Sequence, residues 1–152
     1  MKKLPISISV GLLAGIWTYI SATTGLLTWP AFAGWAVYFF TGADMKGIKE
    51  SVPPAIVGLV LGYISVYINS NYWNGILGLS VLVVIIAFIM TYLMNYPLFA
   101  LAPAAFLGAA VYFGAGGLVA ASVPFFIGLI ILGLLSTSLG GLIENMIGGK
   151  SQ

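Results

Sequence analysis

Residues 76–90 read ILGLSVLVVIIAFIM, a run in which only Gly78 and Ser80 are not strongly apolar. The run does not alternate between apolar and polar residues, which argues against a transmembrane β-strand and favours a membrane-spanning helix. The whole chain shares this character: 61% of its 152 residues are apolar, 5% are charged, and the mean hydropathy is +1.15. A soluble domain carries about 25% charged residues. The composition therefore predicts an all-α integral membrane protein.

The predicted fold has six transmembrane helices in one membrane domain. We expect them over residues 6–24, 30–42, 52–69, 75–93, 97–113 and 123–143. Six spans use about 120 residues, which leaves no room for a soluble domain. The start of the chain imitates a signal peptide, but the apolar run continues into Trp17, so we expect a retained first helix. Residues 43–50 form a charged loop, and Ser51 is predicted to cap the third helix, with Pro53 and Pro54 in its first turn.

The residue types that are missing exclude most catalytic chemistry. The chain contains no His, Cys or Arg, so thiolate and imidazole chemistry are excluded, and we expect no metal, no cofactor and no catalytic residues. The three carboxylates, Asp44, Glu50 and Glu144, lie at the edges of the predicted spans, where they cannot serve ion coupling inside the membrane. A net charge of +2 gives no reason to expect nucleic-acid binding. We predict that the protein is not an enzyme.

Lysine positions predict the orientation. All five lysines fall on one side of the six-helix arrangement: Lys2, Lys3, Lys46, Lys49 and Lys150. The opposite loops, near Gly25, 70–74 and 114–117, carry no charge. Because lysines are enriched in cytoplasmic loops, both termini are expected in the cytoplasm.

An internal repeat is the strongest pattern in the sequence. Residues 31–39 (AFAGWAVYF) and 105–113 (AFLGAAVYF) agree at seven of nine positions, at an offset of 74. Residues 51–53 and 122–124 both read SVP at an offset of 71, which continues through Gly62 and Gly133 and through Ser65 and Ser136. A unit of three helices must enter the membrane from opposite sides in its two copies. We therefore predict two inverted three-helix repeats, about 6–69 and 75–143, an arrangement that recurs in transporters.

Several short motifs carry a resemblance to a known family. They are Trp29-Pro30, Gly34-Trp35, Tyr38-Phe39, Asp44 and Ser51-Val52-Pro53-Pro54. With these motifs the chain resembles the bacterial inner-membrane family called domain of unknown function 1097, the YcdZ-like proteins. The resemblance implies a multi-pass inner-membrane protein and implies no activity.

The repeat also selects candidate residues for a solute path. Ser65 and Ser136 would place one hydroxyl on each side of the centre of a symmetric conduit, and Tyr38 and Tyr112 would place one ring at each mouth. Further candidates are Thr23, Thr24 and Asn95 on the path and Glu144 at a pore mouth. Each has a plainer alternative, because Ser and Thr often bond to their own helix and Tyr often anchors a helix at the interface.

Two functional hypotheses follow. The first is a passive channel or facilitator for a small neutral or weakly polar solute, in which Leu at Ser65 or Ser136 would block flux without preventing folding. The second is a structural or accessory membrane subunit without transport activity. In both cases the expected partners are the lipid bilayer and further copies of the chain, since small-residue pairs such as Gly11 and Gly15 suit helix packing.

The orientation can be tested with topology reporters. A reporter fused after Lys49 should be cytoplasmic, and one fused after Trp73 should be external, because lysine bias sets the orientation. Enzymatic activity of sided reporters in intact cells measures both positions. An external Lys49 would contradict the proposed topology.

Overall fold

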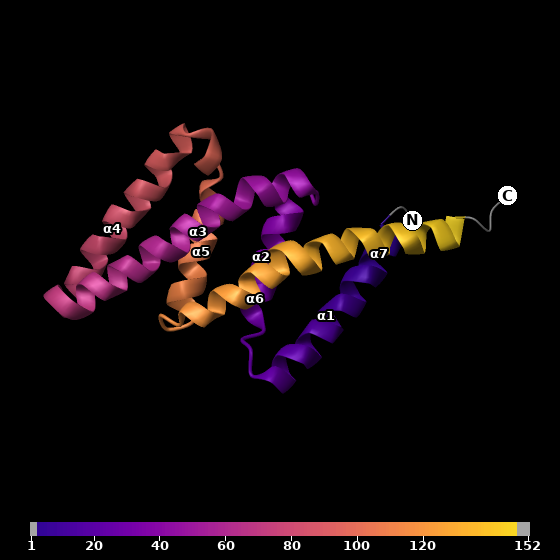
Figure 1. The fold of residues 1–152 in the computed structure, drawn as a ribbon, viewed down its shortest axis with the longest axis horizontal. Coiled ribbons are helices and arrows are strands. Elements are labelled where there is room, and N and C mark those ends of the chain that lie inside the picture. Colours follow the sequence, from indigo (N-terminus) through magenta and orange to yellow (C-terminus); the bar gives the residue numbers. More distant parts are fainter. Residues whose placement is uncertain (1–2, 149–152) are drawn as a thin grey trace.

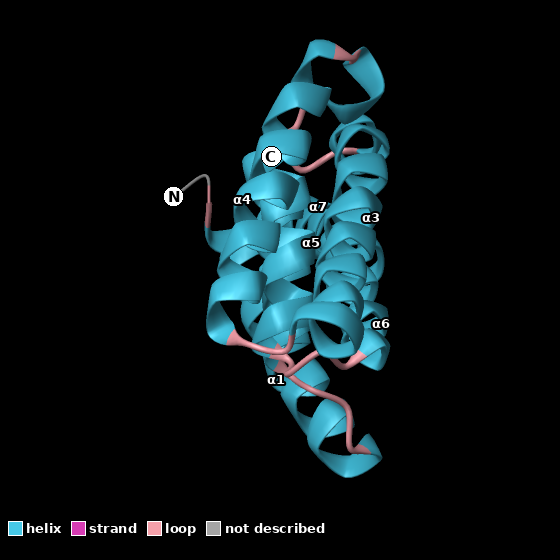
Figure 2. Cartoon of the chain, turned by 90° about the vertical axis from the view of Figure 1, so that its left-hand side faces the viewer, coloured by secondary structure: helices cyan, strands magenta, loops and turns pink. Residues whose placement is uncertain are grey.

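The computed structural model describes residues 3–148, and their regular secondary structure is entirely helical (Figure 2). The α-helices are α1 (Leu4–Thr24), α2 (Trp29–Phe40), α3 (Met45–Ile68), α4 (Ile76–Tyr92), α5 (Ala102–Gly114), α6 (Ser122–Phe126) and α7 (Gly133–Gly148). Short 3₁₀ turns are η2 (Leu93–Asn95), η3 (Pro97–Phe99) and η4 (Val119–Ala121). Two π-helices complete the set: η1 (Asn69–Trp73) extends α3, and η5 (Ile127–Leu132) joins α6 to α7. The prediction of an all-α fold is confirmed.

Four helical segments are long and apolar enough to cross a membrane. They cover Leu4–Thr24, Met45–Trp73, Ile76–Asn95 and Val119–Ile147. The remaining two, α2 with 12 residues and α5 with 13, are about 18–20 Å long, against about 30 Å of hydrocarbon. These short helices also carry much of the buried core, so protein surrounds them more than it surrounds α1 or α4.

The helix ends gather on two sides of the molecule (Figure 1). The start of α1, the α2–α3 connection and the α4–α5 connection lie toward the top of the view, and the other three connections lie toward the bottom. We call the first side the lysine side, because Lys3 precedes α1 and because Lys46 and Lys49 lie in the first turns of α3. Lys2 and Lys150 lie outside the described residues.

Helix α3 begins seven residues earlier than predicted. Its N-cap is Asp44, whose carboxylate accepts a hydrogen bond from the Gly47 amide at 2.7 Å. The prediction that Ser51 caps this helix is wrong: Ser51 is buried inside α3, and its hydroxyl donates to the Gly47 carbonyl at 2.7 Å. Pro53 and Pro54 accordingly lie in the helix interior rather than in its first turn. The charged segment is helical because the Asp44 carboxylate caps the first turn of α3 at the Gly47 amide, a capping role that Asp commonly plays.

The later helices also differ from their predicted bounds. The expected helix over 97–113 is interrupted: a 3₁₀ turn precedes α5, and Pro103 lies in the first turn of α5, where a missing amide costs nothing. The expected loop over 70–74 largely continues α3 as a π-helix. The final helix extends to Gly148, so Glu144 lies on its exposed surface rather than in a tail.

Close backbone contacts join helices that are distant in the sequence. Helix α2 packs against α6 and η5, and α5 packs against α3. At four glycines a methyl group would overlap a backbone oxygen of the neighbouring helix: Gly34 on Phe125, Gly128 on Ala31, Gly58 on Ala105 and Gly108 on Ala55. Small residues permit this approach, which supplies van der Waals packing where lipid offers no hydrophobic driving force.

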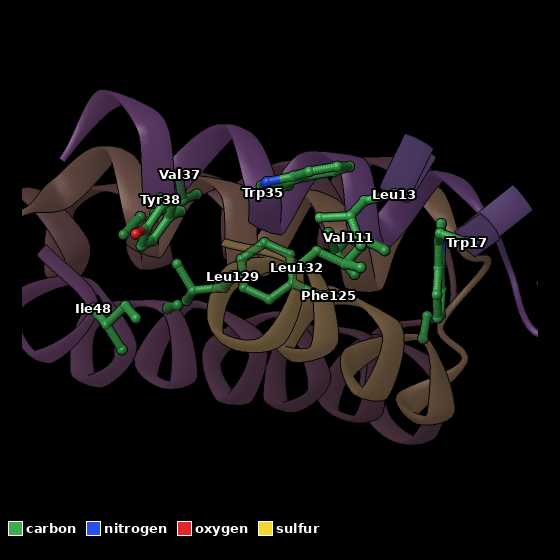
Figure 3. Packing of buried hydrophobic residues seen from close by; sticks show 14 residues of the cluster. Leu13, Trp17, Trp35, Val37, Tyr38, Ile48, Val111, Phe125, Leu129 and Leu132 are labelled. Carbon is green, nitrogen blue, oxygen red and sulfur yellow. The ribbon is translucent and has the colours of Figure 1, made fainter. Parts of the chain in front are cut away.

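The largest cluster of buried side chains lies between these helices (Figure 3). Trp17 lies at one end of the view and Tyr38 and Ile48 at the other, with Phe125 and Leu129 of the last helical segment between them. Helix α1 contributes only Leu13 and Trp17 of its described residues to this cluster and packs against α7, whereas α4 packs outside the cluster, against α3. The short helices are therefore central and the long helices α1 and α4 are peripheral.

The backbone contacts predict a sharp difference between two glycine substitutions. Gly58→Ala should lower the free energy of unfolding by about 2 kcal/mol, because the added methyl meets the backbone of Ala105. Gly11→Ala is the matched control: no atom lies within 4 Å of the added methyl, and Ala favours helix, so stability should be unchanged or slightly raised. Thermal unfolding in detergent measures both variants. Equal stability would contradict the close contact.

Candidate functional site

A largely apolar groove of about 510 Å³ lies between α3, the end of α5 and the start of the last helical segment, toward the side opposite the lysine side. Its lining residues come from α3, from the end of α5 and from the start of the last helical segment: Ile56, Leu59, Val60, Tyr63, Tyr112, Val119, Ser122 and Phe126. None of these side chains is charged. The volume lies within the range of about 300–1,000 Å³ that is typical of small-molecule sites.

The polar groups of the groove are three hydroxyls. The Tyr63 ring meets the Tyr112 ring edge-on, with ring centroids 6.2 Å apart. The Tyr112 ring also packs against Gly62, which brings it close to α3, and its hydroxyl lies beside the turn at Gly117. The Ser122 hydroxyl donates to the Val119 carbonyl at 2.7 Å. The groove thus combines an aliphatic wall with an aromatic pair and a hydroxyl near the α5–α6 turn.

A hydrogen-bonded cluster lies on the lysine side of the molecule. Ser136 is fully buried on α7, and its hydroxyl donates to the Gly133 carbonyl at 2.6 Å. The same hydroxyl accepts a hydrogen bond from the Trp35 indole at 3.3 Å. The backbone carbonyl of Ser136 accepts from the Ser9 hydroxyl at 2.8 Å. Ser136 therefore connects α1 and α2 to α7.

Tyr38 of α2 forms a further connection to α7, at Thr137, the residue after Ser136. Its ring packs against Gly133, and its hydroxyl lies 2.8 Å from the hydroxyl of Thr137. It also donates to the Ala43 carbonyl at 2.7 Å, in the turn before α3. We call Ser9, Trp35, Tyr38, Ser136 and Thr137 the inter-half cluster.

The predicted path residues do not come together. Ser65 is fully buried, and its hydroxyl donates to the carbonyl of Gly62 in its own helix at 2.8 Å. Thr23, Thr24 and Asn95 are exposed, and each bonds to a carbonyl of its own helical segment. Glu144 is exposed on α7. Only Tyr112 lines the groove, while Tyr38 and Ser136 belong to the inter-half cluster.

The burial of both serines corrects an expectation. Leu at Ser65 or Ser136 was expected to spare folding because the hydroxyls would be exposed, but both side chains have zero exposure. A larger side chain there would disrupt the packed core.

Sequence reasoning missed Tyr63, Ser9 and Trp35. Trp35 carried a usable signal, because it is one of two positions at which the nine-residue repeat differs, with Ala109 in the second copy. A difference inside an otherwise matching repeat marks a place where the two copies do different things. Tyr63 and Ser9 gave no comparable signal. Across residues 3–148, no three potential metal ligands of the His, Cys, Asp or Glu type lie together.

These features define a helical membrane protein with a tightly packed core and a groove lined by uncharged side chains. The chain belongs to the family described as "Protein of unknown function (DUF1097)", which matches residues 7–141. It is similar to "Inner membrane protein YcdZ" of Escherichia coli (strain K12), with 32% identity over 116 residues, 75% of this chain and 71% of that protein. The protein of the same name from Salmonella typhimurium (strain LT2) is 30% identical over 115 residues, 75% of this chain and 72% of that protein. No solved structure matches the fold.

The two paired serines provide a test of the inter-half cluster. Ser136→Ala removes the acceptor of the buried Trp35 indole, whereas Ser65→Ala removes a hydroxyl that bonds only within its helix. We expect Ser136→Ala to lower the free energy of unfolding by about 1 kcal/mol more than Ser65→Ala. Reversible unfolding in detergent measures the difference. Equal losses would show that the bond from Trp35 adds no stability.

Proposed function

We propose that the protein is a passive facilitator for small uncharged solutes in the bacterial inner membrane. In this proposal the chain crosses the membrane six times as two inverted three-helix repeats, with the lysine side in the cytoplasm. The single observation that carries the proposal is an asymmetry between two otherwise matching halves: the groove lies on one side and the inter-half cluster on the other.

The short helices support the repeat. Six buried positions of α2 recur in α5 at the offset of 74, namely Pro30, Ala31, Gly34, Trp35, Val37 and Tyr38 with Ala104, Ala105, Gly108, Ala109, Val111 and Tyr112. Both helices end in the same way. The Ala43 amide donates to the Tyr38 carbonyl at 3.0 Å, and the Gly117 amide donates to the Tyr112 carbonyl at 2.9 Å. Ala43 and Gly117 both have left-handed backbone angles, with φ of 57° and 84°.

The outer helices support the same relation. Helix α1 packs on α7 of the other half, and α4 packs on α3 of the other half. The sequences of α1 and α4 do not match, yet three buried positions of each share a four-residue spacing and an offset of 73: Ser9, Leu13 and Trp17 with Leu82, Ile86 and Met90. The first helix of each half thus packs on the last helix of the other half.

The repeat offset between α3 and the last helical segment (α6, η5 and α7) changes along the length of these helices. Gly58 meets Ala105 and Gly128 meets Ala31, which implies an offset of 70 rather than 71 at this level. Further along, Gly62 meets Tyr112 and Gly133 meets Tyr38, an offset of 71. The π-helix η5 contains Gly128 and ends directly before Gly133, and its wider turn absorbs one extra residue of the second copy. Pro124 then corresponds to Pro54, and both are fully buried.

The asymmetry favours a carrier-like facilitator over an open channel. Both tyrosines are buried, but Tyr112 lines the groove, while the equivalent Tyr38 is bonded to Thr137 of the other half. A solute could therefore enter the groove from the side opposite the lysine side but would find the lysine side closed. Passage would require the closed half to open, as in other transporters built from inverted repeats.

The groove lining supports an uncharged solute. An ion would lose its hydration without gaining a partner, since the lining offers hydroxyl groups and no charge. Coupling to an ion gradient has no support here, because Asp44, Glu50 and Glu144 lie at helix ends or on exposed surface.

A structural or accessory subunit is the second candidate. The close backbone contacts and the fully buried Ser65 and Ser136 favour it, because they describe a core built for packing. Either function is compatible with a homo-oligomer. We include one in the proposal because Gly11, Gly15 and Gly141 have no neighbour within 4 Å of an added methyl, which leaves room for a second copy.

Solute flux into proteoliposomes tests the proposal. Liposomes containing the protein should take up glycerol or urea faster than empty liposomes, measured by light scattering after an osmotic step. Val60→Trp should return the flux to the empty-liposome rate, because Val60 lines the groove and is 49% exposed, so a larger ring fills space without disturbing the core.

Val84→Trp is the matched control. Val84 is 69% exposed on α4 and is not part of the groove, so its flux should equal that of the parent protein. Uptake no faster than in empty liposomes across water, glycerol, urea, ammonia and small acids would refute the facilitator and favour the accessory subunit.

A further inference from the structure

We propose that the inter-half cluster is the gate that closes the lysine side of the protein. This inference rests on the proposed facilitator function and assigns the part of the fold that must open for a solute to leave the groove. The cluster joins Ser9 of α1 and Trp35 and Tyr38 of α2 to Ser136 and Thr137 of α7. Opening the gate means parting α2 from α7 at this level.

The hydrogen bonds between the two halves are concentrated at one place. Within residues 3–148, every such bond ends on Ser136 or Thr137 of α7. The close contacts elsewhere between the halves involve backbone and apolar atoms. The lysine side is therefore the end at which directional interactions hold the halves together.

The equivalent positions on the other side lack these bonds. In the second copy of the repeat, the position equivalent to Ser9 is Leu82, at an offset of 73. The positions equivalent to Trp35 and Tyr38 are Ala109 and Tyr112, at an offset of 74. In the first copy, Ser65 and Val66 are equivalent to Ser136 and Thr137, at an offset of 71. The Ser65 hydroxyl bonds within its own helix.

Among the described residues, the Tyr112 hydroxyl forms no hydrogen bond with the other half, and its ring borders the groove. The half of the molecule without the cluster is thus the half that holds the groove.

The gate is built from interactions that a modest conformational change can break. All five side chains are uncharged, so separating them leaves no unpaired buried charge. Each neutral hydrogen bond shifts an equilibrium by roughly three- to tenfold. The π-helix η5 ends directly before Gly133, on which the Tyr38 ring packs. π-Helical turns are rare and are often found at functional sites, so η5 marks a break in the regular helix directly next to the gate.

Site-directed thiol labelling tests the gate, and the chain contains no cysteine of its own. Val37→Cys and Val111→Cys are paired reporters: both valines have zero exposure and lie beside Tyr38 and Tyr112. Full-length protein in oriented vesicles is treated with a charged, membrane-impermeant methanethiosulfonate from either side. In the Tyr38→Phe background, labelling of Val37→Cys from the lysine side should rise about threefold, since the phenol loses its hydrogen bond to Thr137 across the gate. Thr137→Val removes the same bond from the other partner, so it should also raise the labelling about threefold.

The controls separate gating from general loosening. Tyr112→Phe should leave both reporters at their parental rates, and Val111→Cys should stay unreactive in the Tyr38→Phe background. Unchanged labelling of Val37→Cys in both Tyr38→Phe and Thr137→Val would overturn the gate. Equal rises in Val37→Cys and Val111→Cys would also overturn it, because they indicate unfolding. The measurement needs no solute, so labelling as predicted in a protein without flux would retain the gate and discard the facilitator.

Discussion

The arrangement of this chain depends on direct contact between helix backbones. Gly58 against Ala105 and Gly128 against Ala31 bring helices of different halves so close that no side chain fits between them. In a bilayer, apolar side chains gain little by leaving lipid, so helices associate through close packing and hydrogen bonds. The short helices α2 and α5 can therefore occupy the centre, and the long helices α1 and α4, whose outer surfaces are apolar, can face lipid.

Because the two halves share a packing scheme, the few positions at which their side chains differ explain why their structures differ locally. Tyr38 and Tyr112 end equivalent helices with equivalent turns, yet one is sealed by hydrogen bonds and the other borders a groove. Substitutions at neighbouring positions account for this difference, since Trp35 has a hydrogen-bonded partner in Ser136 and Ala109 can have none. The asymmetry is therefore encoded in a few polar side chains rather than in the backbone scheme.

Composition predicted an all-helical membrane protein, and short motifs such as Gly34-Trp35 carried the resemblance that predicted its family. The repeat singled out residues 31–39 and 105–113. The start of α3 was missed because prolines were weighed above Asp44, a stronger cap. The sequence could not separate path residues from packing residues, because a hydroxyl side chain that lines a conduit has the same sequence pattern as one that bonds to its own helix, as Ser65 does. The register of the long helices depended on the π-helix η5, for which apolar sequence gives no signal.

The central claim is that the two halves share one architecture inserted in opposite directions. Met45 and Val119 are separated by the repeat offset of 74 and are 49% and 56% exposed, directly after the equivalent turns. Single cysteines at these positions, labelled with an impermeant maleimide in intact cells and in inverted vesicles, test the claim most directly. We predict labelling of Met45→Cys only from the cytoplasmic side and of Val119→Cys only from the external side. Labelling of both from the same side would contradict the inverted repeat.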